Sequence, residues 1–316
     1  MSDSKIIAVV GATGAQGGGL ARAILADADG GFALRALTRK VESDNARALA
    51  AAGAEVVAAD NDDEASLVRA LQGAHGAYFV TNFWEHVSPD REQAQAAAMA
   101  RAAKAAGVAH AIWSTLEDSR RFVPLADERM PTLMGRYKVP HFDAKGESDR
   151  FFAEAGVPTT YLLTSFYWEN LIYFGMGPKR AADGVLEWTM PLGNARFPGM
   201  AVEDIGRCAY GIFKRGAEFV GQRVGIAGEQ LSGAEMAAAM ATAFGEPVRY
   251  RALDPALYRG LGFPGAEDLG NMFQFNTEFA AEFCAARDLA RSRALNPALQ
   301  TFAQWLAANK ARIPLA

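Results

Sequence analysis

The sequence is poor in the residues that form disulfides and bind metals. Of its 316 residues only two are cysteines, Cys208 and Cys284, and only four are histidines, His75, His86, His110 and His141. The cysteines lie far apart, and neither residue type shows the paired spacing of metal ligands. This pattern excludes a disulfide framework and predicts no metal site.

The chain also lacks a long apolar run and an excess of charge. No stretch approaches the roughly 18 uncharged apolar residues of a membrane helix, and the first residues lack the basic and apolar regions of a signal peptide. Half of the residues are hydrophobic and the formal net charge is -4, so nothing favours general binding of nucleic acid. No helix-turn-helix pattern or dense basic stripe is present either. We expect a cytoplasmic globular protein that binds neither membrane nor nucleic acid.

Two kinds of segment alternate through the first half of the chain. Short apolar runs typical of buried strands occupy 5–10, 33–38, 55–59, 78–81, 109–114 and 160–164. Between them, helical periodicity or alanine-rich sequence covers stretches such as 18–28, 43–52 and 91–106. Strict alternation of strand and helix predicts a parallel sheet with helices on both faces. We therefore expect an α/β fold built on a doubly wound, Rossmann-type sheet.

The alternation breaks down near Phe166. Beyond it, short strands, Gly/Pro turns and helices such as 233–244 follow one another irregularly. We predict a first domain over residues 1–165, to which a later stretch of about 198–225 returns. The remainder, within 166–316, is predicted to form a smaller, interleaved α/β domain.

A glycine-rich turn follows the first predicted strand. In "VVGATGAQGGG" (9–19), Gly11, Gly14 and Gly17 form G-x-x-G-x-x-G between a strand and a helix. Such glycines permit a tight turn, let the backbone approach a pyrophosphate, and let the helix pack against the sheet. The helix N-terminus then presents free N–H groups to the phosphates. The arrangement predicts a dinucleotide site.

The end of the second strand favours one dinucleotide over the other. NAD sites usually place Asp or Glu there to accept hydrogen bonds from the ribose. This chain has Arg39 and Lys40 with no acid beside them in the sequence. Two cations suit the 2′-phosphate of NADP(H), with Arg39 as its planar partner. The alternative is that both are ordinary solvated loop charges.

Polar and aromatic residues follow the next two strands. Asp60 and Asn61 lie where a side chain meets the adenine edge, while Asp62 or Asp63 also suits the N-cap of the next helix. After the fourth strand comes Thr81-Asn82-Phe83-Trp84, which would lie at the carboxyl edge of the sheet, where ligands of such folds bind. The Phe-Trp pair either packs in the protein or contacts the nicotinamide half.

Matches along nearly the whole chain point to a family. They are "GATGAQGG" (11–18), "TNFWE" (81–85), "HFDAKGE" (141–147), "FYWENL" (166–171), "LGFPGAEDLGNMFQF" (261–275) and "FAQWLAANK" (302–310). With these the sequence resembles the NmrA-like family of atypical short-chain dehydrogenases/reductases, and within it the branch of NADPH sensors. The resemblance implies binding of NADP(H) and is consistent with a homodimer.

The same resemblance assigns residues to parts of the cofactor. It implies that the pyrophosphate is held by Gly11, Thr13, Gly14, Ala15, Gln16 and Gly17. Arg39 would bind the 2′-phosphate, with Asp60 and Asn61 on the adenine side. The ribose and nicotinamide would lie near Thr81, Asn82, Phe83 and Lys145, with Tyr167, Trp168, Glu169 and Asn170 over the nicotinamide end.

The catalytic pattern of typical short-chain reductases is incomplete. Those enzymes carry Tyr-x-x-x-Lys on one helical face, where the lysine lowers the pKa of the phenol and the tyrosine donates the proton. Here the stretch reads His141-Phe142-Asp143-Ala144-Lys145. Lys145 is a candidate acid or base, as in related isoflavone-reductase-like enzymes, and His141 could replace the phenol. Ser114, or its neighbour Thr115, occupies the place of the substrate-orienting hydroxyl. The alternative is a solvated His141 in a first helical turn and a Lys145 that only binds ribose.

Two functions in different classes remain open. The leading one is a redox-responsive regulator that binds NADP(H), because the tyrosine is missing. The alternative is an NADPH-dependent reductase that uses Lys145 on a carbonyl, quinone or aryl substrate in an apolar, aromatic pocket. The long connection over 117–140 is either a lid over the nicotinamide or a disordered surface excursion.

Overall fold

The computed structural model describes residues 4–315, which divide into two units. The first unit contains the residues up to Asp118 together with His141–Thr164 and Ile205–Val224. The second contains Ser119–Pro140, Ser165–Asp204 and the chain from Gly225 onward. The sequence had assigned residues 119–140 to the first domain, whereas the structure groups them with the second unit.

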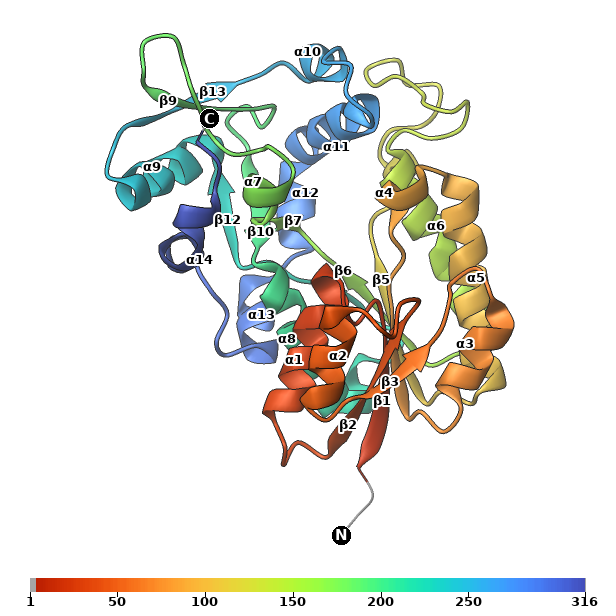
Figure 1. The fold of residues 1–316 in the computed structure, drawn as a ribbon. Helices are drawn as coiled ribbons and strands as arrows, with labels where there is room; N and C mark the ends of the chain where they lie inside the picture. The colour runs from red at the N-terminus through yellow and green to blue at the C-terminus, as the bar shows by residue number, and fades with distance from the viewer. Residues whose placement is uncertain (1–3, 316) are drawn as a thin grey trace. The chain divides into compact units, whose positions relative to one another are not determined.

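A seven-stranded sheet forms the centre of the first unit, as Figure 1 shows. Its order is β11-β6-β5-β4-β1-β2-β3, and neighbouring strands from β1 to β6 pair parallel. The strands are β1 (Lys5–Val10), β2 (Phe32–Thr38), β3 (Glu55–Ala58), β4 (Gly76–Phe79), β5 (His110–Thr115), β6 (Thr159–Leu163) and β11 (Arg223–Gly225). The predicted doubly wound sheet is confirmed.

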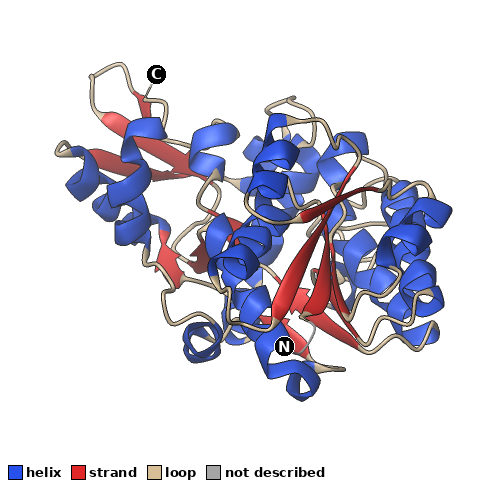
Figure 2. Ribbon diagram, turned by 60° about the horizontal axis from the view of Figure 1, so that its bottom comes forward, coloured by secondary structure: helices blue, strands red, loops and turns tan. Residues whose placement is uncertain are grey.

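Helices cover both faces of this sheet (Figures 1 and 2). Helices α1 (Ala15–Ala26), α2 (Asp44–Ala51) and α8 (Val202–Arg215) lie on one face. Helices α3 (Glu64–Leu71), α5 (Pro89–Ala105) and α6 (Pro140–Glu154) lie on the other. The short α4 (Phe83–His86) precedes α5, and a 3-10 turn, η2 (Gly216–Phe219), follows α8.

Alanines allow α5 to pack closely on the sheet. Ala96, Ala100 and Ala103 are buried at this face, within a core that also holds Phe79, Trp113 and Phe152. The ring of Phe152 stacks on Trp113 with centroids 5.2 Å apart and lies 5.6 Å from Phe79. Small residues of α5 and large aromatic residues of β4, β5 and α6 fill this layer together, as dense interior packing requires.

The other face owes its close packing to glycine. A Cβ atom at Gly206 of α8 would lie 2.0 Å from the backbone nitrogen of Leu20 in α1, so only glycine fits where the helices meet. Helix α1 also starts three residues before the predicted Gly18. Its first turns contain Gly17, Gly18 and Gly19, whose low helix propensity hides the helix in the sequence.

The second unit contains two three-stranded sheets with helices around them. The sheets have the orders β12-β10-β7 and β13-β9-β8. Their strands are β7 (Phe166–Tyr167), β8 (Lys179–Arg180), β9 (Leu186–Met190), β10 (Arg196–Met200), β12 (Glu229–Ser232) and β13 (Val248–Ala252). The helices are η1 (Ser119–Arg121), α7 (Asn170–Tyr173), α9 (Gly233–Phe244), α10 (Pro255–Arg259), α11 (Ala266–Glu278), α12 (Ala280–Ala285), α13 (Leu289–Leu295), α14 (Phe302–Asn309) and η3 (Lys310–Arg312). Within residues 4–315, no helix has both the length and the apolar character needed to cross a membrane.

Residues 119–140 are ordered against α11, which corrects the alternative of a disordered excursion. The buried Lys138 donates from Nζ to the carbonyl oxygens of Asp127 and Met130, both at 2.7 Å. Asn271 of α11 donates from Nδ2 to the carbonyls of Pro131 (2.9 Å) and Lys138 (2.6 Å). These bonds satisfy carbonyl groups of the segment, including those of the buried residues Met130 and Lys138, and fix its path.

Candidate functional site

The carboxyl ends of the parallel strands bring the predicted residues of the first unit to one edge of the sheet. At the end of β1, Gly11 has φ +66°, a conformation that glycine adopts without strain, and its carbonyl accepts a hydrogen bond from the Gly14 N–H at 2.8 Å. A Cβ atom at Gly17 would lie 2.4 Å from that carbonyl oxygen. Both glycines are therefore required by the turn itself.

The turn leaves the start of α1 open to an anion. Gly14 is the N-cap and supplies no side chain to the first N–H groups, and the first turn carries no acidic residue. Gly14 and Ala15 are exposed and Thr13 is half-buried. Helix N-termini of this kind bind phosphate through their N–H groups and dipole, so this turn fits a pyrophosphate.

Gln16 is turned toward the sheet. Its Oε1 accepts hydrogen bonds from the hydroxyls of Tyr78 and of Ser114, the latter at 2.8 Å. All three side chains are buried. Ser114 thus stands at the end of β5, as predicted, and its hydroxyl is tied to the glycine turn. Tyr78 was missed because a tyrosine inside an apolar strand resembles an ordinary core residue.

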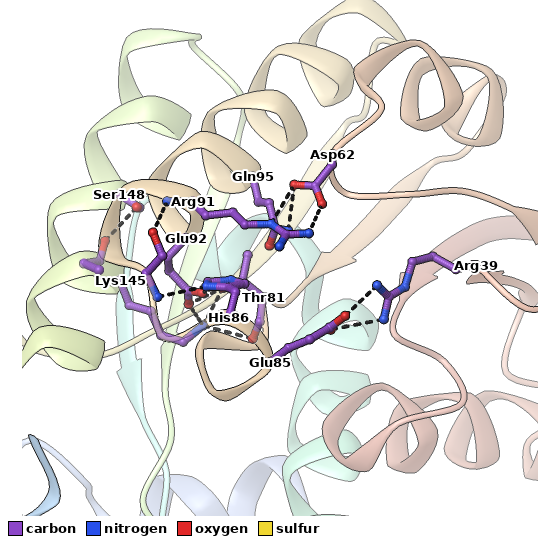
Figure 3. Close-up of polar contacts among 12 residues, drawn as sticks. Arg39, Asp62, Thr81, Glu85, His86, Arg91, Glu92, Gln95, Lys145 and Ser148 are labelled. Carbon is purple, nitrogen blue, oxygen red and sulfur yellow. Dashed lines mark hydrogen bonds and ion pairs between the residues drawn. The ribbon is translucent and has the colours of Figure 1, made fainter. Parts of the chain in front are cut away.

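Arg39 has an acidic partner that the local sequence does not contain. Its Nη1 and Nη2 donate to the two carboxylate oxygens of Glu85 in α4, at 2.6 and 3.1 Å (Figure 3). These hydrogen bonds raise the pKa of Arg39 and lower that of Glu85, and the charges of Asp60 and Asp62 act on Arg39 in the same direction. The expectation of a guanidinium without a neighbouring carboxylate was wrong. Lys40 is exposed.

The acidic loop after β3 is organised mainly by its own hydrogen bonds. Asp63 is the N-cap of α3 and accepts from the Ser66 N–H, which confirms the capping alternative. Asp62 pairs with Arg91 and accepts from Gln95 in α5 (Figure 3). Asp60 accepts from the Asp62 N–H at 3.0 Å and is half-buried. Asn61 is also half-buried. Their contact with adenine stays a prediction.

Lys145 lies in a buried cluster of polar groups (Figure 3). Its Nζ donates to the Thr81 hydroxyl at 2.6 Å and to the Thr81 carbonyl at 3.3 Å. It also lies 2.9 Å from Oε1 of Glu92, a residue of α5 that is 0% exposed. The Thr81 hydroxyl in turn donates to Oε1 of Glu92 at 2.5 Å. An ammonium, a hydroxyl and a carboxylate thus hold one another at the end of β4.

His86 completes this cluster. Its Nδ1 accepts a hydrogen bond from the Ser88 N–H at 3.1 Å, which leaves the ring proton on Nε2 when the imidazole is neutral. That Nε2 lies 3.6 Å from Oε2 of Glu92. Both atoms are buried and have no hydrogen-bonding partner within the described chain. The sequence did not single out His86 or Glu92, because both resemble ordinary residues around a helix start.

His141 is enclosed by aromatic rings and is not solvated. It is 7% exposed, and its ring centroid lies 4.9 Å from Trp84, 5.9 Å from Phe83 and 4.8 Å from Phe142. It does follow Pro140 in the first turn of α6, as expected. Phe83 is 2% exposed and Trp84 39% exposed, so the Phe-Trp pair packs mainly through Phe83. Asn82 is exposed at the start of α4.

Helix α6 is anchored to β5 through Asp149, one turn beyond Lys145. Its carboxylate accepts from the Thr115 hydroxyl at 2.6 Å, from the Trp113 indole N–H at 3.1 Å, and from Arg223. Burial raises the pKa of Asp149, against the opposing effects of Arg223 and the hydrogen bonds. This anchor fixes the helix that presents Lys145.

The remaining predicted residues belong to the second unit. Trp168 is 1% exposed and packs 5.3 Å from Phe302, centroid to centroid. Glu169 accepts from the Val202 N–H at 3.0 Å and from the Trp305 indole at 2.9 Å, and burial raises its pKa. Tyr167 and Asn170 are half-buried. Trp168 and Glu169 therefore hold the second unit together, and the contact of 167–170 with nicotinamide stays a prediction.

Comparisons with known proteins find similarity along most of the chain. A model of the NmrA-like family matches residues 3–306. The oxidoreductase FrzB of Cladobotryum, an NmrA-like family domain-containing protein, is 29% identical over 89% of this chain and 86% of its own length. An NAD(P)H azoreductase of Xenophilus azovorans is 33% identical over 78% of this chain and 77% of its own length.

Solved structures share the fold. NmrA, described as a negative transcriptional regulator, in complex with NADP has a TM-score of 0.75 at 24% identity, over 97% of this chain and 95% of that chain. Its complex with NAD has a TM-score of 0.78 at 22% identity, over the same shares. The fold is therefore one that holds either nicotinamide dinucleotide.

Proposed function

The chain belongs to the NmrA-like family, and on this premise we propose that it is an NADP(H)-dependent reductase of a carbonyl, quinone or aryl compound. The observation that carries the proposal is the buried Lys145, whose ammonium is held at the end of β4 by Thr81 and Glu92. Relatives described as oxidoreductases, at 29% and 33% identity over most of the chain, favour an enzyme over a binding protein.

The residues at the sheet edge fit a nicotinamide dinucleotide. The turn from Gly11 to Gly17 excludes side chains and leaves α1 without a capping side chain, which suits a pyrophosphate. Arg39 and Lys40 follow β2, where the adenosine ribose of such a cofactor is recognised. Two cations there support NADP(H) as the preferred form. The bound cofactor supplies a hydride.

Lys145 has the chemistry to supply the accompanying proton. An ammonium can protonate an oxygen or nitrogen of the acceptor next to the atom that would take up the hydride, which gives Lys145 the role of a general acid. Glu92 holds this group in place, since its carboxylate lies 2.9 Å from the ammonium in a buried site. The hydroxyl of Ser114, held by Gln16, stands at the end of the neighbouring strand as a group that could orient the acceptor.

A panel of quinones, aryl azo compounds and aldehydes tests the proposal. We expect acceptor-dependent oxidation of NADPH, and we expect Lys145→Met to lower kcat/KM by about 10²-fold or more. Because this variant leaves Glu92 buried without its partner, the double variant Lys145→Met/Glu92→Gln provides a matched, uncharged site. Equal turnover by the wild type and both variants would contradict a catalytic lysine.

One observation favours a second candidate, a regulator that responds to the cofactor. The tyrosine of typical short-chain reductases is replaced by His141, whose ring lies among aromatic side chains. A homodimer whose association changes with NADPH, NADP⁺ or no cofactor would support this role. Sedimentation velocity and limited proteolysis in the three conditions measure it. Identical results in all three conditions, together with turnover of an acceptor, would exclude the regulator and support the reductase.

A further inference from the structure

The Arg39–Glu85 pair lies across the strand that carries the glycine turn. The sheet order is β4-β1-β2. Arg39 follows β2, and Glu85 lies in α4, which follows β4. The residues are 46 positions apart in the chain, and the strand between them, β1, ends at Val10, directly before Gly11. Glu85 thus places a carboxylate beside the end of β2, where the adjacent residues of the chain, Arg39 and Lys40, are both cations.

The geometry of the pair leaves part of the guanidinium available. Glu85 occupies Nη1 and Nη2, and among the described residues it is the only hydrogen-bonding partner of Arg39. The edge formed by Nε and one Nη remains for an anion, as Arg geometry allows. A phosphate on that edge would lie beside a carboxylate, or it would displace the carboxylate. Both cases disfavour phosphate.

A ribose hydroxyl, unlike a phosphate, is favoured by a nearby carboxylate. Carboxylates near the end of the second strand accept hydrogen bonds from the ribose of NAD, and they repel a 2′-phosphate. In this chain the residues after β2 lack such an acid, and Glu85 brings one from a different element. At a ribose 2′ position beside this pair, Arg39 would favour a phosphate and Glu85 would favour a hydroxyl.

We propose that Glu85 is a cofactor-specificity residue that weakens the preference for a 2′-phosphate, so that the site accepts NADH as well as NADPH. The inference rests on the proposed function, since it concerns the same cofactor site. Both side chains are well exposed, 51% for Arg39 and 41% for Glu85, and water weakens such pairs. The effect is therefore expected to be a modest change in selectivity and not a loss of binding.

Two adenosine fragments isolate this effect from the nicotinamide half. Isothermal titration of 2′,5′-ADP and 5′-AMP compares wild type with E85Q. We expect E85Q to bind 2′,5′-ADP about two- to fivefold more tightly, the range that corresponds to one exposed ion pair, and to bind 5′-AMP no more tightly than wild type. R39Q should lose the preference for 2′,5′-ADP, and the gain from E85Q should shrink at about 1 M salt, where charges are screened.

Glu218 provides a matched control. It pairs with Arg215, and the two side chains are 50% and 40% exposed. It lies by the amino end of β6, because the carbonyl of the next residue, Phe219, accepts from Thr160. E218Q removes the same charge at the opposite edge of the sheet and should leave both titrations unchanged.

The outcomes separate the inference from the function on which it rests. Unchanged or weaker binding of 2′,5′-ADP by E85Q, or a gain matched by E218Q or by 5′-AMP, overturns the role of Glu85 while NADP(H) binding stands. If wild-type protein binds neither fragment nor NADPH nor NADH, the proposed function fails, and the inference fails with it.

Discussion

Glu92 is the fully buried half of the pair with Lys145, and its replacement by glutamine tests whether that pair holds the site together. Glutamine keeps the shape of the side chain and an oxygen that can accept from the Thr81 hydroxyl. It removes the charge at nearly constant volume, and it replaces the oxygen near Nε2 of His86 by an amide NH₂. Lys145, with a side chain 10% exposed, would then keep a buried ammonium without its counter-ion. The variant therefore isolates the electrostatic part of the interaction.

The expected cost follows from the burial of the two groups. Removing one partner of a buried ion pair costs about 3–5 kcal/mol, because the remaining charge is left uncompensated. For a domain of 150–250 residues, about 1 kcal/mol shifts the melting temperature by roughly 2–4 °C. We therefore expect Glu92→Gln to lower the melting temperature of the first unit by about 6–20 °C.

Differential scanning calorimetry measures this shift, with Glu64→Gln as the control. Glu64 in α3 pairs with Arg101 of α5 at 2.6 Å, but the two side chains are 41% and 58% exposed. An exposed pair contributes at most about 1 kcal/mol, so the control should melt within a few degrees of wild type. Each variant removes one carboxylate charge from an ion pair between two helices, and the pairs differ in burial, so the two variants are directly comparable.

The double variant Glu92→Gln/Lys145→Met decides between charge and packing. If the single variants are destabilised by uncompensated charges, removing both charges should restore most of the lost stability, because replacing a whole buried pair is often neutral. Additive losses, or a Glu92→Gln variant that melts like Glu64→Gln, would refute the interpretation of Lys145 as a charged group held by Glu92.

Three further predictions follow from individual contacts. Gly17→Ala should abolish tight NADPH binding in fluorescence titrations, because the new Cβ atom would lie 2.4 Å from a backbone oxygen. In the control Gly18→Ala, the nearest atom to the new Cβ belongs to a flexible arginine side chain 3.2 Å away, and this variant should bind NADPH. Equal binding by both variants would contradict a tight turn. Burial lowers the pKa of His110 to about 4, whereas a histidine in the unfolded chain is protonated near pH 6.5. The unfolded state therefore binds a proton first as the pH falls, and the free energy of unfolding should decrease by about 3 kcal/mol from pH 6.5 to 4. In urea titrations at several pH values, the free energy of unfolding of His110→Gln should not show this decrease. An unchanged dependence of the free energy of unfolding on pH in the variant would contradict the prediction. Asn271→Ala should remove the side-chain donor to the carbonyls of Pro131 and of the buried Lys138 and so increase hydrogen exchange within 119–140. Unchanged exchange would show that other contacts order the segment.

Regular local patterns made most of the first unit predictable. Apolar runs separated by helical periodicity located β1 to β6 to within two residues at each end. The glycine spacing located the turn that follows β1. Helix α4 was missed because its four residues carry no repeated pattern. Phe83 is buried there by the surrounding fold, and one buried apolar side chain is too little to predict a helix from the sequence.

The carboxylates of the site could not be found from local patterns. Glu92 stands near the start of α5, where an acidic residue usually favours the helix dipole and faces water. In the fold, Glu92 is buried and pairs with Lys145 of α6, which follows 53 positions later in the sequence. Glu85 likewise meets Arg39 across a gap of 46 residues. Such pairings depend on strand order, which a single sequence does not encode in any short window.

Both carboxylates come from one short stretch of chain, and their burial gives them different properties. Glu85 in α4 and Glu92 in α5 are seven residues apart, and they neutralise Arg39 and Lys145 respectively. The Arg39 pair is exposed, so a phosphate can displace its carboxylate at a cost of at most about 1 kcal/mol. The Lys145 pair is buried, so its carboxylate cannot be released without exposing an uncompensated charge to the protein interior. The same chemical pairing thus yields an adjustable contact at one end of the proposed cofactor site and a fixed one at the other.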